Sequence, residues 1–407
     1  MTQSREDVVD DLLAADAVAD PFPYLAVLRE RHPVHYSEPL GGWLVTRYED
    51  VQASLRDLRL SSDRIGPWYH GRLDAERQER LESTYRVLSR WMVFNDPPEH
   101  TRLRRLVQQA FTPRMIENLR GRVEGVVTSL LDEIRGEGEV DLIQRFAYPL
   151  PAIVIAEMLG VPPEDRDTFR EWSNEITSLV FGALGVQDRH ERAQTALGEL
   201  TSYFDRLIAR RGATGTDVLG ALIAAEEAGD ALDREEIIAT CVLLLFGGHE
   251  TTTNLIANGT LALLRNPDQL ALLRENPERI PGAVEELLRY DGPVKAQVRS
   301  VTEDIELRGV QLRAGQRVFL VQAAANRDPD QFPDPDVLDI GRPNANTHVT
   351  FGYGIHYCLG APLARLEAHL AFRSLLTTLP SLELVPQELS WQPVIITRAL
   401  DRLMVRV

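Results

Sequence analysis

A helical pattern from Arg234 to Arg265 is the feature that most limits how this chain can fold. Asp233 is a good N-cap, and Glu236 stands three residues later, as in a capping box. Pro267 marks the end of the pattern. About 32 helical residues extend for about 48 Å. The pattern therefore predicts a helix long enough to cross a whole domain.

The middle of this pattern is poor in helix formers. It reads Phe246-Gly-Gly-His-Glu-Thr-Thr-Thr253, with two glycines and three β-branched threonines. The glycines alone cost about 2 kcal/mol relative to alanine. Threonine hydroxyls can bond to the i−4 carbonyl and bend the turn. We expect a local widening that makes room for a ligand, with His249 in helix packing or in solvent and Cys241 as a small buried hydrophobe.

Helical patterns dominate the rest of the chain, and strand-like stretches are short. Mostly helix with a minor β portion and no internal boundary predicts one integrated α+β unit over residues 1–407. The further helices are expected at Pro21–Arg31, His100–Phe111, Met115–Arg135, Tyr148–Leu159, Glu191–Arg211, Asp268–Glu275 and Ile280–Tyr290, and the strands at His35–Tyr36, Trp43–Thr46, Ile305–Leu307, Arg317–Val321 and in the tail Val394–Val407.

Composition excludes several classes of protein. Two cysteines rule out a disulfide framework, and without a Cys-x-x-Cys pair a structural zinc site is not expected. A net charge of −17 argues against nucleic acid and anionic lipid as partners. The N-terminal residues hold no long apolar run, so we expect neither a signal peptide nor a membrane anchor, and a cytoplasmic location.

The other cysteine, Cys358, stands in the stretch Phe351-Gly-Tyr-Gly-Ile-His-Tyr-Cys-Leu-Gly360, directly before a helical pattern from Ala361 to Leu379. A sulfur at a helix N-terminus meets N–H donors and the positive end of the helix dipole, and both favour the thiolate. Glycines let the backbone approach a flat ligand. A glycine-rich turn with an inert cysteine is the alternative, but six fixed positions in ten residues are hard to meet by chance.

This stretch fits F-G-x-G-x-H-x-C-x-G and resembles the cysteine-ligand loop of the cytochrome P-450 (heme-thiolate monooxygenase) family, in its soluble bacterial form. The resemblance implies the family's triangular, mainly helical fold, with a long central helix over a heme b. It implies that the Cys358 thiolate is the axial ligand of the heme iron. The loop residues that would contact the cofactor are Phe351, Gly352, Gly354 and Gly360.

The middle of the long helix also matches this family, in the motif (A/G)-G-x-(D/E)-T-(T/S). By resemblance, Gly247 and Gly248 form the groove for dioxygen, Thr251 donates a hydrogen bond there, and Glu250 relays protons from solvent. Taken alone, the residues also allow glycines that serve helix packing, a back-bonded threonine and a glutamate in a surface ion pair.

Heme propionates need charged partners, because buried carboxylates are costly without them. His100 and Arg104 lie four apart on one helix face, where the family contacts the propionates, and Arg299 and His356 are the further candidates. An exposed arginine or a core histidine is the ordinary alternative for each. Glu286 and Arg289 match the family's E-x-x-R helix, and with Arg342 we expect a structural cluster that braces the Cys358 loop.

By resemblance, four stretches would line the substrate pocket: the loop Ile65–Val93, the helix pair around Trp172–Phe181, the segment Val294–Val298 and the turn Ile395–Ile396. Lys295 is the only lysine. The residue type favours a solvated position on a strand, and a contact with a polar group of the substrate is the alternative. The candidate lining residues are Trp91, Val93, Ile176, Val180, Phe181, Val294, Lys295 and Ile395.

The implied reaction inserts one oxygen atom of O2 into a lipophilic substrate, by hydroxylation or epoxidation, as in secondary metabolism. We expect no flavin or nicotinamide domain, so a separate ferredoxin would deliver the electrons. The protein is expected to be a monomer. We expect the ferredoxin to dock on a basic patch of this protein, made of Arg102, Arg105, Arg114, Arg365 and Arg373. The alternatives are oxidative coupling or a peroxide-driven reaction on the same heme, a non-catalytic member that recruits partners, and a heme sensor or gas carrier.

Overall fold

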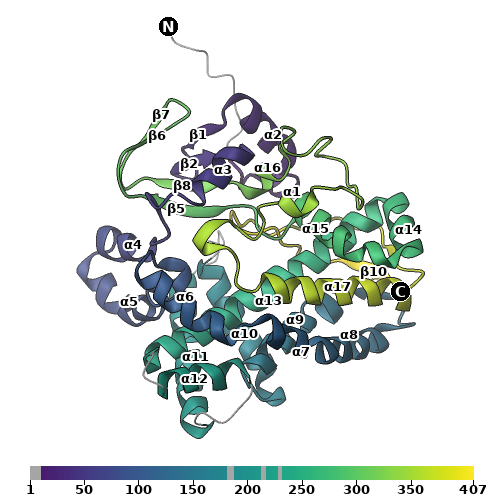
Figure 1. The fold of residues 1–407 in the computed structure, drawn as a ribbon, viewed down its shortest axis with the longest axis horizontal. Coiled ribbons are helices and arrows are strands. Elements are labelled where there is room, and N and C mark those ends of the chain that lie inside the picture. The colour runs from purple at the N-terminus through teal and green to yellow at the C-terminus, as the bar shows by residue number, and fades with distance from the viewer. Residues whose placement is uncertain (1–10, 181–187, 212–216, 228–231) are drawn as a thin grey trace.

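The computed structural model describes residues 11–180, 188–211, 217–227 and 232–407, and most of these residues are helical (Figure 1). The longer α-helices are α2 (Phe22–Arg31), α3 (Tyr48–Ser54), α4 (Ile65–Arg72), α5 (Ala75–Leu88), α6 (Glu99–Ala110), α7 (Pro113–Asn118), α8 (Arg120–Ile134), α9 (Pro149–Met158), α10 (Arg166–Val180), α11 (Arg189–Arg211), α12 (Val218–Glu227), α13 (Arg234–Arg265), α14 (Pro267–Glu275), α15 (Ile280–Asp291) and α17 (Ala361–Thr378). Two short ones are α1 (Ala15–Ala19) and α16 (Gln322–Ala325). Within these ranges no helix is long and apolar enough to cross a membrane.

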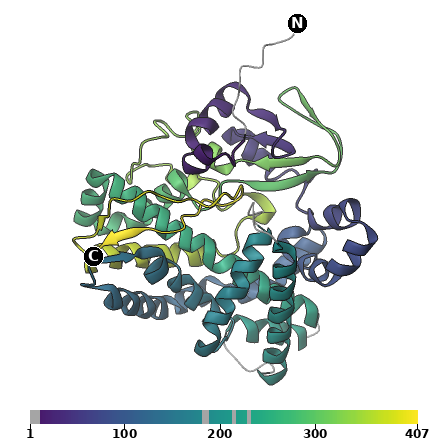
Figure 2. The ribbon, with the colours of Figure 1, turned by 180° about the vertical axis from the view of Figure 1, so that it is seen from behind.

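The strands form one larger sheet and two small ones. They are β1 (Val34–Ser37), β2 (Gly42–Val45), β3 (Leu60–Ser61), β4 (Glu139–Asp141), β5 (Gln297–Val301), β6 (Ile305–Leu307), β7 (Val310–Leu312), β8 (Arg317–Leu320), β9 (Glu383–Leu384) and β10 (Met404–Arg406). The larger sheet has the order β1-β2-β8-β5-β3, in which β2 and β8 are parallel. The outline is roughly triangular, with this sheet near one corner and the helices filling the rest (Figures 1 and 2).

The central helix α13 has the bounds that the sequence predicts. The Asp233 side chain accepts from the N–H of Glu236, and the Glu236 carboxylate accepts from the N–H of Asp233, which completes the capping box. The helix packs against α9, α15 and α17. It stays α-helical through the glycines, and Thr253 bonds back to the His249 carbonyl at 2.9 Å. The helix therefore has no break at the position where we expect a local widening.

Several segments differ from the sequence prediction; the tail Val394–Val407, for example, holds a strand only at Met404–Arg406. The expected loop Ile65–Val93 holds α4 and α5, which lie beside each other; Asp74 caps α5 by accepting from the N–H of Arg77. The pattern Met115–Arg135 is two helices, α7 and α8, which meet at Leu119. Thr112 caps α7 and Pro113 begins it, so α7 has a start signal that the periodic pattern alone does not show.

The two ends of the described chain are joined across the fold. Arg398, near the C-terminus, donates to the carbonyls of Val18 and Ala19 at 2.6 and 3.0 Å. Strand β10 pairs with β4, with Val405 opposite Val140. These contacts hold the C-terminal segment against α1 and β4.

Candidate active site

Cys358 lies on a tight loop that leads directly into α17. Gly352 and Gly354 have φ of +75° and +73°, values that residues with a Cβ rarely adopt. The N–H of Cys358 donates to the carbonyl of Phe351 at 2.9 Å and closes the loop. Two glycines at positive φ thus set the path that presents the sulfur.

The electrostatic environment of Cys358 is mixed. Burial raises the pKa of the thiol, whereas the N–H groups of Gly360 and Ala361 and the charge of Arg104 lower it. Burial outweighs the other contributions, so the helix N-terminus acts in the expected direction without producing a thiolate by itself. A coordinated metal cation deprotonates a thiol outright, and a heme iron would do so here.

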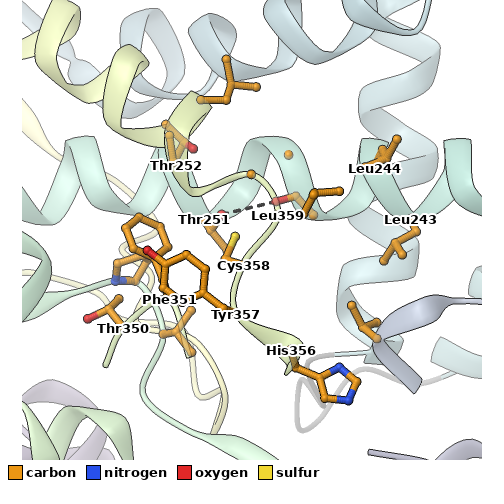
Figure 3. A pocket seen from close by; sticks show the side chains of 18 of the residues that line it. Leu243, Leu244, Thr251, Thr252, Thr350, Phe351, His356, Tyr357, Cys358 and Leu359 are labelled. Carbon is orange, nitrogen blue, oxygen red and sulfur yellow. Dashed lines mark hydrogen bonds between the residues drawn. The ribbon is translucent and has the colours of Figure 1, made fainter. Parts of the chain in front are cut away.

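A cavity of about 280 Å³ lies between the Cys358 loop and α13. The Cys358 side chain is open to this cavity, although the surrounding protein shields it from bulk water, and it points toward the part of α13 that carries Thr251 and Thr252 (Figure 3). Leu243 and Leu244 add an apolar wall from the same helix. The predicted site residues that line this cavity are Val93, His100, Arg104, Gly247, Gly248, Thr251, Val294, Phe351, His356, Cys358 and Gly360.

The two glycines of α13 differ in their surroundings. A Cβ added to Gly247 would meet no atom within 4 Å, whereas one on Gly248 would lie 2.8 Å from Cγ1 of Ile155 in α9. Gly247 therefore leaves space on the cavity side, and Gly248 permits the close approach of α9 and α13. The surroundings of Gly247 fit a groove for a ligand, and those of Gly248 fit close helix packing.

Basic side chains gather at the cavity without paired carboxylates. The rings of His100 and His356 lie 4.1 Å apart, and His100 Nδ1 and His356 Nε2 are buried without a hydrogen-bond partner in the described part of the chain. Burial, with the Arg104 charge, lowers the pKa of His100 to about 4, and burial next to His100 lowers that of His356 to about 3. Two carboxylates would supply the missing acceptors, so these residues fit a heme with its propionates.

Arg299 lies close to this group but does not line the cavity. Its guanidinium donates to the Val298 carbonyl at 3.0 Å and to Oε1 of Gln297 at 2.9 Å, and burial lowers its pKa to about 10. Gln297 itself lines the cavity. Gln297 belongs to the expected lining segment Val294–Val298, but it was not an individual candidate, because an amide in a strand carries no signal of its own.

Thr251 and Glu250 occupy different surroundings on α13. The Thr251 hydroxyl lines the cavity and donates to the Gly247 carbonyl at 3.4 Å, a long bond that leaves it able to find another partner. Glu250 does not line the cavity. Burial raises its pKa to about 7, and the Thr177 hydroxyl of α10 offsets part of that rise. A carboxyl with this pKa exchanges protons readily near neutral pH.

Glu367 of α17 is a second buried acid, which sequence reasoning missed. It lines the cavity and is 1% exposed, and neither carboxyl oxygen meets the geometry of a hydrogen bond. Burial raises its pKa to about 8, with a small opposing effect of the Thr252 hydroxyl. The one available signal is an acid that stands directly between the apolar residues Leu366 and Ala368.

The structure brings Glu286, Arg289 and Arg342 together in a buried cluster. Glu286 Oε2 lies 2.7 Å from Arg289 Nε and 3.1 Å from Arg342 Nε. Both guanidinium groups also donate to the Val337 carbonyl, and each donates to further backbone carbonyls nearby. On the same helix, Glu285 binds Arg365 at 2.6 Å, whose guanidinium lies over the Phe351 ring. These contacts tie α15 to the Cys358 loop.

The other substrate-pocket candidates lie elsewhere. Trp91 and Ile176 are fully buried core residues. Lys295 is 6% exposed and is not among the residues that line the cavity. Val180 and Ile395 line a second cavity of about 640 Å³. Phe181 falls outside the described residues.

Comparison with known proteins gives consistent matches. A family model described as Cytochrome P-450 matches residues 73–392. The chain is 44% identical to Cytochrome P-450 monooxygenase PikC of Streptomyces venezuelae, over 97% of this chain and 92% of that protein. It is 40% identical to 6-deoxyerythronolide B hydroxylase of Saccharopolyspora erythraea, over 98% and 99%. The crystal structure of P450BioI with a hexadec-9Z-enoic acid ligated acyl carrier protein superposes with a TM-score of 0.89 at 38% identity, covering 97% of this chain and 100% of that one.

Proposed function

The chain belongs to the cytochrome P-450 family of heme-thiolate monooxygenases, and we propose that it hydroxylates or epoxidises a lipophilic substrate with electrons from a separate ferredoxin. The observation that carries this proposal is the exposed sulfur of Cys358, which points across an apolar cavity at Thr251. We place the reaction in the cytoplasm, where a thiol ligand stays reduced.

Heme, when bound, supplies an iron that binds and activates dioxygen. Cys358 Sγ would hold that iron. His100, Arg104 and His356, which line the cavity, would bind the propionates, with Arg299 beside them through Gln297. The apolar wall of α13 excludes water from the oxygen side.

Protons would reach this side from Glu250 and Thr251. The Thr251 hydroxyl is the group on the cavity, and its bond to the Gly247 carbonyl is long enough to be exchanged for a bond to a ligand. Glu250, with a pKa of about 7, would return protons from the α10 side of the helix. The pair divides the task between a donor at the site and an acid behind it.

The docking patch for the ferredoxin is smaller than the five predicted arginines. Arg102 pairs with Glu99 and Glu236, and Arg365 pairs with Glu285, so their charges are compensated inside the protein. Arg105, Arg114 and Arg373 are exposed, and the last two make no ion pair in the described part of the chain. We propose these three as the patch.

The test is the absorption of the reduced protein with carbon monoxide. We expect a Soret band near the position typical of a thiolate ligand, and loss of that band in Cys358→His with heme still bound. Cys241→Ser is the matched control, because Cys241 is fully buried in α13 and should leave the band unchanged. A histidine-type spectrum in the wild type, or a purified chain that takes up no heme, would overturn the proposal.

A further inference from the structure

The second cavity, of about 640 Å³, has an unbalanced charge. Its walls are mostly aliphatic and aromatic, and the ionisable side chains on them are basic: Arg64, Arg317 and His190. No aspartate or glutamate lines it among the described residues. Apolar walls with cations alone favour an occupant that combines an apolar body with a negative charge.

The cavity lies next to the Cys358 cavity along two segments of the chain. Val93 lines the first and Phe94 the second; Gln297 lines the first and Val298 the second. The turn that ends in Phe94 and the start of β5 therefore contribute neighbouring residues to both cavities. A ligand held in the second cavity would share these two wall segments with the Cys358 cavity.

Arg64 is the cation of this cavity without a partner. It precedes α4, and its guanidinium lies 4.7 Å from the centre of the Phe94 ring. No carboxylate or carbonyl of the described residues accepts a hydrogen bond from it. Arg317, in contrast, donates to the carbonyl of Leu40 at 3.2 Å. Arg64 is partly buried, and a guanidinium in such a wall without an acceptor can donate to a ligand that supplies one.

Nearby acids are already used. Asp63, the preceding residue, accepts from the N–H groups of Ile65 and Gly66 at 3.1 and 2.8 Å. Asp96 accepts from Ser61 and from the N–H of Ser62. The nearest charge that acts on Arg64 is Arg299, which repels it. Burial and that repulsion lower the pKa of Arg64 to about 10, so the side chain stays charged at neutral pH.

An aromatic stack fixes Arg64 relative to the central helix. The Phe94 ring stacks on Trp91 at 5.7 Å, and Trp91 packs on Phe246 at 5.2 Å. Phe246 directly precedes Gly247 in α13. A contact with Arg64 would therefore position a bound molecule against the same helix that presents Thr251.

We propose that Arg64 binds the carboxylate of an amphipathic organic acid whose apolar body fills the second cavity. This inference rests on the proposed function and names its substrate class. A guanidinium offers a carboxylate two parallel hydrogen bonds, and the stack on Phe94 holds the fork in place. The alternative partner is a heme propionate; Arg64 does not line the Cys358 cavity, whereas His100, Arg104 and His356 do.

The experiment compares dodecanoate with dodecan-1-ol, which have the same chain and differ in charge, by calorimetric titration of the heme-loaded protein. We expect wild type to bind dodecanoate about tenfold or more tightly than the alcohol. In Arg64→Met, which keeps an apolar contact with Phe94, the two affinities should become similar. Arg64→Lys should keep part of the preference, because it keeps the charge.

Arg313→Met is the matched control. It removes the same charge from an exposed arginine that pairs with Asp304, outside this cavity, and should leave the preference unchanged. Equal binding of both probes by wild type, no saturable binding of dodecanoate, or an equal loss for both probes in Arg64→Met would overturn the inference. So would loss of heme from Arg64→Met, which would assign the residue to a propionate. A normal thiolate spectrum in these variants leaves the proposed function standing in either case.

Discussion

At the scale of single residues, Lys295 is a buried cation without a described side-chain partner. Its side chain makes no hydrogen bond or ion pair with the described residues, although its N–H donates to the Ile396 carbonyl at 2.7 Å. Burial lowers the pKa of Lys295 to about 7, the charge of Arg398 adds to this, and Asp291 opposes it. Lys295 is 6% exposed, so the expected assignment as a solvated strand residue is wrong, and a contact with substrate stays a prediction.

We predict that Lys295→Met stabilises the protein. The folded-state pKa of about 7 lies below the ordinary lysine pKa of 10.5, so between these pH values the unfolded chain binds more protons. Wild-type stability thus rises with pH in this window, and the full penalty is present below it. We expect Lys295→Met to gain about 2 kcal/mol at pH 7 and less at pH 9, in urea unfolding. Lys295→Arg, charged throughout, should gain at neither pH, and an equal gain of the Met variant at both would contradict the assignment.

Glu250 gives a second prediction, on activity. Burial places its pKa at about 7, so the neutral acid is depleted as pH rises above 7. We expect product formed per electron pair consumed to decline across pH 6–8 in wild type, and turnover of Glu250→Gln to be lower by about a hundredfold, with no such pH dependence. Glu235→Gln is the control, since Glu235 is an acid of the same helix that pairs at the surface with Arg90. Unchanged turnover in Glu250→Gln would remove this residue from the proton path.

At the scale of elements, the glycine pair of α13 allows two neighbouring substitutions to be compared. Gly248→Ala places a Cβ 2.8 Å from Ile155, and we expect it to lower the free energy of unfolding by about 1–3 kcal/mol through overpacking. Gly247→Ala meets open space, and we expect it to raise that free energy by up to about 1 kcal/mol through helix propensity.

The variant that is more stable should bind carbon monoxide less tightly. The methyl group added in Gly247→Ala enters the cavity, so we expect weaker carbon monoxide binding in this variant. The folded fraction of Gly248→Ala should bind carbon monoxide normally. Thermal unfolding and carbon monoxide titration measure the two effects. A stabilised Gly248→Ala would show that α9 yields to the added methyl.

Elements with local signals could be predicted, and those that depend on tertiary burial could not. Asp233, Glu236 and Pro267 set the bounds of α13 by hydrogen bonds and sterics within a few residues. The helices α4 and α5 were missed because α5 is strongly polar and shows little apolar periodicity; its start depends on the cap at Asp74. The sequence contains the capping residue of α5, but it does not show that this cap outweighs the weak apolar periodicity.

The same distinction holds for the site. The chain positions of Cys358, and of His100 and Arg104 on one helix face, follow from a motif and from i, i+4 spacing, and the structure brings all three to one cavity. Glu367 and Arg64 have no motif. Their importance depends on which side chains fail to reach them, and that is a property of packing between α17, α13 and the α4 region.

At the scale of the whole molecule, the net charge of −17 opposes approach of an acidic ferredoxin, so docking depends on local charge. We predict that replacing Arg114 and Arg373 together by Gln slows electron transfer several-fold at low salt and leaves a weaker dependence on ionic strength. Arg308→Gln is the control, because this arginine pairs with Glu49 and Asp50 away from the Cys358 loop. Stopped-flow reduction by ferredoxin measures the rates, and rates independent of salt in wild type would count against the patch.

The bonds from Arg398 to Val18 and Ala19, and the pairing of β10 with β4, join segments that lie far apart in the sequence. These contacts can form only after Arg398 and β10 have been synthesised, whatever the order in which the helices form. We therefore expect cofactor uptake to follow synthesis of this segment, and nascent chains halted shortly before Arg398 to stay colourless.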